Sequence, residues 1–118
     1  MNKQDQEQHR LAALAAGYKA KKGASGRFFK WESSGNFDEW WQVWHPKTCK
    51  VDSFDLMVAC SMFTGFTKKG NTAVAAHPYT DIECQKGVSE TPANDLMQAI
   101  FDCAVEIGRL METQDNEP

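Results

Sequence analysis

The chain has 118 residues, 42% of them hydrophobic and 25% charged, with a formal net charge of -3 at pH 7. This length suits one domain with a modest core, so we expect residues 1–118 to form a single domain with short tails at 1–3 and 113–118. The mild negative charge disfavours a general nucleic-acid binder, because such proteins normally carry a basic surface.

The sequence also predicts a cytoplasmic protein. It contains no apolar run of the roughly 20 residues that a transmembrane helix needs, and its polar start, Met1 to Gln8, does not resemble a secretory signal. The four cysteines lie at positions 49, 60, 84 and 103. Cys60 and Cys103 occupy apolar positions of predicted helices, where a free thiol behaves as a small hydrophobic group.

The first half of the chain predicts a helix followed by a β-hairpin. Apolar residues at 11, 14 and 15 follow helical spacing over residues 4–16, and Gly17 suits the left-handed position after a helix. We expect residues 19–26, rich in Lys and Gly, to form a loop. Residues 27–32 and 39–45 then predict a hairpin across the turn formers of 33–36.

The second half predicts a helix, a hairpin and a long closing helix. Asp52 is the expected N-cap of a helix that runs to about Met62, and residues 63–67 and 72–77 predict a hairpin across 68–71. We expect 78–90 to be mostly loop. The closing helix begins with Thr91 as cap and Pro92 in its first turn and runs to about Glu112. The predicted order is α-ββ-α-ββ-α: an α+β domain with a small antiparallel sheet from two β-hairpins, packed with helices.

Three of the four tryptophans fall within residues 40–44, and Trp31 lies just upstream. Strand alternation places Trp40 and Trp44 on one face and Trp41, Val43 and His45 on the other. We expect the first face, together with Phe29 and Trp31, to serve the core. The second face, with basic residues nearby, is expected to bind a partner or ligand, because tryptophan and arginine dominate protein–protein hot spots. The predicted binding residues are Lys21, Lys22, Arg27, Phe28, Lys30, Trp41, Val43 and His45.

No motif predicts a metal site, a cofactor or catalysis. His45 and Cys49 are four positions apart and His77 and Cys84 seven, but no paired C-x2-4-C or H-x3-5-H knuckle of a structural zinc site occurs. A Cys–His dyad can be drawn from these residues, yet none lies in a recognisable signature. The sequence therefore favours a protein that is not an enzyme.

Two segments resemble a recurring pattern in small uncharacterised prophage proteins. Trp44-His45-Pro46-Lys47-Thr48 leads into the helix near Asp52, as a Trp-Asn-Pro-Leu-Thr stretch does in that family. The closing helix, with Glu106-Ile107-Gly108, is similar to their last helix. The acidic pair and glycine of the family pattern are replaced here by Cys49, Lys50 and Val51. The resemblance covers about half the chain and implies a phage accessory protein in a bacterial cytoplasm.

Three functions follow from these expectations. The favoured one is a phage-encoded, anti-CRISPR-like protein that inhibits a host antiviral defence component by steric occlusion, with a host protein or complex as its partner. The alternative is a homo-oligomer that sequesters a nucleotide or nucleotide-derived signal between aromatic and basic side chains. A weaker third is a nucleic-acid-binding regulator of phage genes.

Overall fold

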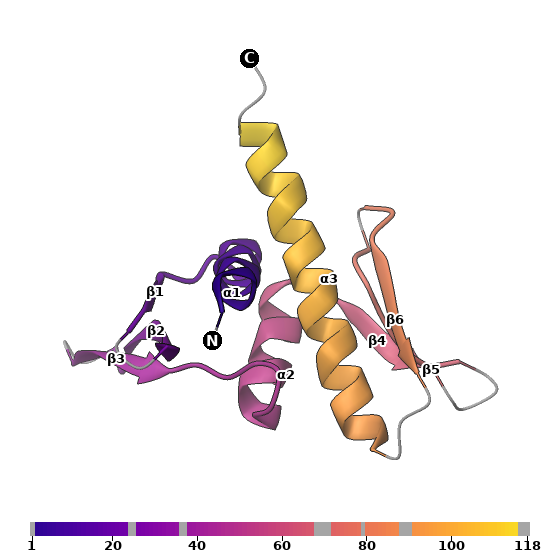
Figure 1. Cartoon of the computed structure of the whole chain (residues 1–118), viewed down its shortest axis with the longest axis horizontal. Coiled ribbons are helices and arrows are strands. Elements are labelled where there is room, and N and C mark those ends of the chain that lie inside the picture. Colours follow the sequence, from indigo (N-terminus) through magenta and orange to yellow (C-terminus); the bar gives the residue numbers. More distant parts are fainter. Residues whose placement is uncertain are drawn as a thin grey trace.

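The computed structural model shows an α+β fold with three helices and two antiparallel sheets, and it describes residues 2–23, 26–35, 38–67, 72–78, 80–87 and 91–115 (Figure 1). The elements, in chain order, are α1 (Lys3–Ala16), β1 (Ala20–Lys22), β2 (Phe28–Ser33), β3 (Glu39–Val43), α2 (Lys50–Ala59), β4 (Phe63–Phe66), β5 (Thr72–Ala76), β6 (Glu83–Gly87) and α3 (Pro92–Asp115). The predicted α+β class and the three helices are confirmed.

The long helix α3 lies in the middle of the molecule (Figure 1). Strands β1, β2 and β3 form sheet A on the α1 side, and β4, β5 and β6 form sheet B on the other. Both sheets are antiparallel and keep the chain order of their strands, so each is a simple meander. Helix α2 packs against α3 between the two sheets.

Two of the strands fall in segments that the sequence predicted as loops. β1 lies within 19–26 and pairs with β2, while β6 lies within 78–90 and pairs with β5. Both are edge strands that carry few large apolar residues, so their pattern alone does not distinguish them from loops. The order is therefore α-βββ-α-βββ-α instead of the predicted α-ββ-α-ββ-α. The predicted turn 68–71 and Asn36 lie outside the described residues.

Helix α1 begins and ends with clear capping interactions. The side chain of Asn2 accepts a hydrogen bond from the Asp5 N–H at 2.8 Å. Gly17 adopts the left-handed conformation with φ 75°, and its N–H reaches the carbonyl of Leu14. The predicted helix over 4–16 is thus confirmed, with Lys3 added at its start.

Helix α2 differs from the prediction at both ends. It begins at Lys50, and its N-cap is Cys49, which makes no side-chain capping hydrogen bond. Asp52 lies inside the first turn, where its carboxylate accepts a 2.8 Å hydrogen bond from the backbone N–H of His45. The helix ends at Ala59, because the chain reverses at Ser61, a non-glycine residue with φ 55°.

Helix α3 starts at Pro92 as predicted and extends to Asp115, three residues past the expected end. The predicted tail residues 113–115 are thus helical, as is Lys3, while Met1 and 116–118 lie outside the described residues. None of the described helices is long and apolar enough to cross a membrane.

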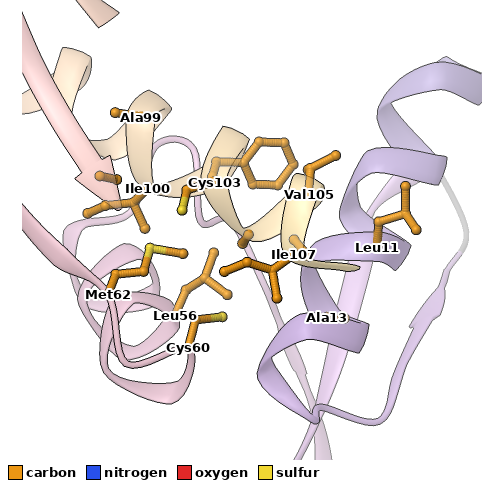
Figure 2. Close-up of a cluster of buried hydrophobic side chains, with 14 of the residues drawn as sticks. Leu11, Ala13, Leu56, Cys60, Met62, Ala99, Ile100, Cys103, Val105 and Ile107 are labelled. Carbon is orange, nitrogen blue, oxygen red and sulfur yellow. The ribbon is translucent and has the colours of Figure 1, made fainter. Parts of the chain in front are cut away.

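The main core forms where α1 and α2 meet α3. Figure 2 shows Ile100, Cys103 and Ile107 of α3 extending toward Leu56, Cys60 and Met62, with Leu11 arriving from α1. Cys60 and Cys103 are buried there, as predicted. Ala73 and Ala75 of β5 bury the inner face of sheet B against the same cluster.

Candidate functional site: the outer face of sheet A

On the inner face of sheet A, Phe28, Lys30 and Trp44 are buried against the core. Phe28 and Trp44 lie next to each other on it, with ring centroids 6.1 Å apart, and both contact the ring of His9 on α1. Lys30 lies on the same face, with its Nζ 2.6 Å from a carboxylate oxygen of Glu32 and 4.2 Å from the ring centroid of Tyr18. The inner face therefore turns toward α1.

The outer face follows from the strand register. Phe29 pairs with Lys21 on one side and with Val43 on the other, and Trp31 pairs with Trp41. Directly paired residues point to the same side of a sheet. The backbone N–H of Trp31 also bonds the carbonyl of Lys19 at 2.9 Å, which extends this row to Lys19. We call the resulting set the tryptophan face; it consists of Lys19, Lys21, Phe29, Trp31, Trp41 and Val43.

Two tryptophans and two lysines interact at the centre of the tryptophan face. The rings of Trp31 and Trp41 meet edge to face with their centroids 4.9 Å apart. The Lys21 Nζ lies 4.2 Å from the centroid of Trp41, and the Lys19 Nζ lies 5.2 Å from that of Trp31 and 6.0 Å from that of Trp41. Both ammonium groups are thus within cation–π range of indole rings.

Gly23 shields one end of this face. A side chain at position 23 would place its Cβ 2.1 Å from Cε2 of Phe29, so the backbone after β1 rests directly on that ring. The N–H of Gly23 also donates to the carbonyl of Arg27 at 2.7 Å. Phe29 is therefore partly covered by its own chain. Trp31, Trp41 and Val43 are likewise half-buried, whereas Lys19 and Lys21 are exposed.

The structure brings only some of the predicted binding residues together. Lys21, Trp41 and Val43 lie on the tryptophan face, as expected. Phe28 and Lys30, predicted to share it, are on the inner face and only 4% and 8% exposed. The prediction that Phe28 and Lys30 share a face with Trp41 is wrong. The register pairs Trp41 with Trp31, so the odd-numbered residues of β2 face outward and Phe28 and Lys30 face inward.

The other predicted residues are exposed but lie elsewhere. Lys22 alternates with Lys21 and therefore lies on the α1 side of β1. Arg27 precedes β2. His45 follows β3 and lines a hollow of about 480 Å³ between β3 and α2, together with Trp40 and Val51. These three residues do not join the tryptophan face.

Three residues of the tryptophan face were missed from sequence: Lys19, Phe29 and Trp31. Lys19 and Lys21 flank Ala20, an alternation of polar and small apolar residues that fits an edge strand. Trp31 was expected in the core with Trp44. Trp44 could have corrected this assignment. Because Trp44 faces the core and pairs with Phe28, the even-numbered residues of β2 face inward and Trp31 faces outward.

A second hollow, of about 470 Å³, lies between α1 and sheet A. Its lining is rich in basic groups and is formed by Lys3, Gln6, Glu7, Arg10, Ala20, Lys21, Lys22 and Phe28. Arg10 is already paired with Glu7 and, at 2.8 Å, with Glu112. The remaining cations make the hollow a candidate for an anionic ligand.

Burial disfavours the thiolate form of three of the four cysteines. Burial raises the pKa of the Cys60 and Cys103 thiols to about 12, so neither is a ready thiolate. Burial also raises the pKa of the Cys84 thiol. No group of three His, Cys, Asp or Glu side chains in the described part of the chain is arranged to hold a metal ion.

Comparisons of the chain with protein-family models, with curated proteins and with solved structures found no significant match.

Proposed function

We propose that this chain is a non-enzymatic binding protein that occludes a surface of a partner protein with its tryptophan face. The observation that carries the proposal is the Trp31–Trp41 pair with the ammonium groups of Lys19 and Lys21 held over it. In line with the resemblance to prophage accessory proteins, we propose a phage protein in the bacterial cytoplasm. Its partner is then a component of host antiviral defence.

The tryptophan face has the chemistry of an interaction hot spot. Tryptophan buries a large area on binding at little conformational cost, and two of them here are already fixed against each other. Lys19 and Lys21 add positive charge around this apolar centre on a chain whose net charge is -3. A matching partner surface presents an apolar or flat side chain to the indoles and carboxylates to the two lysines.

Inhibition by this route is steric. It needs no cofactor and no group that makes or breaks a bond. It requires only that the chain cover a patch of its partner that a second protein or a substrate has to reach.

The basic hollow between α1 and sheet A supports a second candidate, sequestration of a nucleotide or nucleotide-derived signal. Its volume of about 470 Å³ lies within the range of small-molecule sites, and Lys3 and Lys22 could meet phosphate oxygens. We rank it second because the Lys21 ammonium lies over Trp41 on the opposite side of the sheet, which leaves fewer cations for a phosphate group.

The proposal is tested with Trp41→Ala and a matched control, Trp40→Ala. The two tryptophans are adjacent, but Trp40 lies on the other side of β3, where its Nε1 donates to Gln42. Each variant is expressed with a tag in the bacterial host, purified gently and analysed by native mass spectrometry. We expect wild type and Trp40→Ala to retain a host protein and Trp41→Ala to lose it, with thermal melting of both variants close to wild type.

Other outcomes separate the two candidates. Retention of the host protein by Trp41→Ala would contradict the proposed face. A bound mass of a few hundred daltons that disappears in a Lys3→Ala, Lys22→Ala double variant would favour sequestration instead.

A further inference from the structure

The surface around α2 combines exposed apolar residues with hollows on both sides of the helix. Val51, Phe54 and Val58 are 67%, 58% and 58% exposed and follow i, i+3, i+7 spacing, so they form one stripe along α2. An amphipathic helix normally buries its apolar stripe, whereas α2 buries only Ser53 and Leu56 on its opposite side. This stripe is independent of the tryptophan face.

An apolar groove of about 440 Å³ runs along one side of the stripe. Its lining comes from α2, β4 and α3: Lys50, Ser53, Phe54 and Met57 of α2, Thr64 of β4, and Ala93, Leu96, Met97 and Ile100 of α3. Phe66, 46% exposed, lies on the same face of β4 as Thr64. On the other side of α2 lies the hollow that contains Trp40 and Val51.

We propose that this surface, the α2 ridge with its adjacent groove, binds a second copy of the same chain in a two-fold symmetric dimer. A two-fold interface must be self-complementary, with each copy supplying both the protruding and the receiving part. A projecting apolar helix beside an apolar groove meets that condition: the stripe of one copy enters the groove of the other, and the reverse contact forms at the same time.

The size of the surface fits a stable dimer. If a phenylalanine exposes about 200 Å² and a valine somewhat less, the exposed parts of Val51, Phe54, Val58 and Phe66 come to roughly 400 Å². A standard interface buries about 800 Å² per partner, of which roughly 60% is apolar. Together with the walls of the groove, the four residues supply nearly all of that apolar share.

Charge favours an antiparallel arrangement of the two α2 helices. Lys50 lies at the start of α2, and the last turn carries no basic residue. If the helices cross antiparallel near Phe54, Lys50 of each copy lies beside Val58 and the carbonyl end of the partner's α2, where a positive charge is stabilising. A parallel arrangement would instead bring the two lysines together.

The experiment is sedimentation equilibrium of Phe54→Asp, with Phe63→Asp as matched control. Both are exposed phenylalanines, but Phe63 (69% exposed) pairs with Ala76 and lies on the outer face of sheet B, away from the groove. We expect wild type and Phe63→Asp at 50–100 µM (roughly the range in which standard interfaces are occupied) to show twice 13.3 kDa, and Phe54→Asp to show 13.3 kDa.

A charge swap tests the antiparallel register. Val58→Lys places a second cation opposite Lys50 of the partner, so we expect it to weaken the dimer at least tenfold, and Lys50→Glu added to the same chain to restore it. A monomeric wild type at the highest concentration, or a dimer that Phe63→Asp dissociates and Phe54→Asp does not, would overturn the proposal. The host-partner experiment uses Trp41→Ala, which changes the tryptophan face and not the α2 ridge. A negative result for the dimer therefore does not contradict the proposed host partner, and the reverse also holds.

Discussion

Gly108 is the residue that lets α1 approach α3 most closely. A Cβ at this position would lie 2.0 Å from the carbonyl oxygen of Leu11 and 2.7 Å from its carbonyl carbon. Both are backbone atoms of a helix, so relief requires one helix to move as a whole. The packing of α1, and with it the position of sheet A, therefore depends on the absence of a side chain at 108.

We expect Gly108→Ala to lower the free energy of unfolding by about 1–2 kcal/mol, because an overpacking cost of up to about 3 kcal/mol exceeds the gain of about 1 kcal/mol in helix propensity. Urea denaturation followed by circular dichroism measures the change. Gly65→Ala is the control, because a Cβ there meets nothing within 4 Å. We expect it to leave stability unchanged or raise it by up to about 1 kcal/mol, because glycine is the less favourable residue inside a strand; equal effects of the two substitutions would contradict the close helix crossing.

At the scale of elements, the helices could be predicted from sequence because their signals are local. Gly17 and Pro92 mark helix ends through their own backbone chemistry, whereas Asp52, the expected N-cap of α2, lies inside its first turn. The strands could not be placed equally well, since the identity of β1 depends on its hydrogen bonds to β2 and the orientation of β2 on its pairing with β3.

The error in the candidate site has the same origin. Phe28 and Phe29 are both aromatic, so alternation alone does not say which of them faces the core. Lys30 added to the error, because a lysine normally marks a solvent-facing position; here its charge is compensated by Glu32 and the Tyr18 ring. Trp41 could be assigned to the outer face because its neighbours in β3, Trp40 and Gln42, point to the opposite face.

Two buried cysteines lie where α2 packs against α3, so their reactivity reports on that packing. Cys60 is the C-cap of α2 and Cys103 lies on α3. Both are buried in one cluster (Figure 2), and burial raises the pKa of each thiol to about 12. All four cysteines are free, but Cys49 and Cys84 are only partly buried.

We expect Cys60 and Cys103 to react with a thiol reagent at pH 8 at least tenfold more slowly than Cys49, because labelling requires α2 to separate from α3. Mass spectrometry of the labelled peptides identifies each site, and all four should react alike in denaturant. Rapid labelling of Cys60 in the native protein would show that α2 is not packed as described.

At the scale of the whole molecule, His9 joins parts that are distant in sequence. Its ring lies on α1 and contacts Phe28 of β2, Trp44 beyond β3, and Phe101 of α3 with a centroid distance of 4.8 Å. The Nδ1 lies 2.6 Å from the carbonyl oxygen of Asp5, to which it donates when protonated there. The His9 ring of α1 therefore packs against both sheet A and α3 and stabilises their arrangement.

Burial lowers the pKa of His9 below its ordinary value of 6.5, with Lys47 and His45 acting in the same direction and Asp5 opposing it. In the unfolded chain the imidazole takes up a proton as the pH falls through 6.5, whereas in the folded protein it stays neutral to lower pH. The unfolded state then binds more protons, so stability is lost as pH falls below 6.5 and is regained above it.

We therefore expect the melting temperature to decrease between pH 7 and pH 5, a range above the ordinary carboxylate pKa values. His9→Gln removes the imidazole while its amide can still donate to the Asp5 carbonyl, so its melting temperature, although lower at pH 7, should change less across this range. His45→Gln removes only the smallest influence on the pKa of His9 and should therefore keep most of the wild-type slope. A wild-type slope retained in His9→Gln would show that another group accounts for the loss of stability.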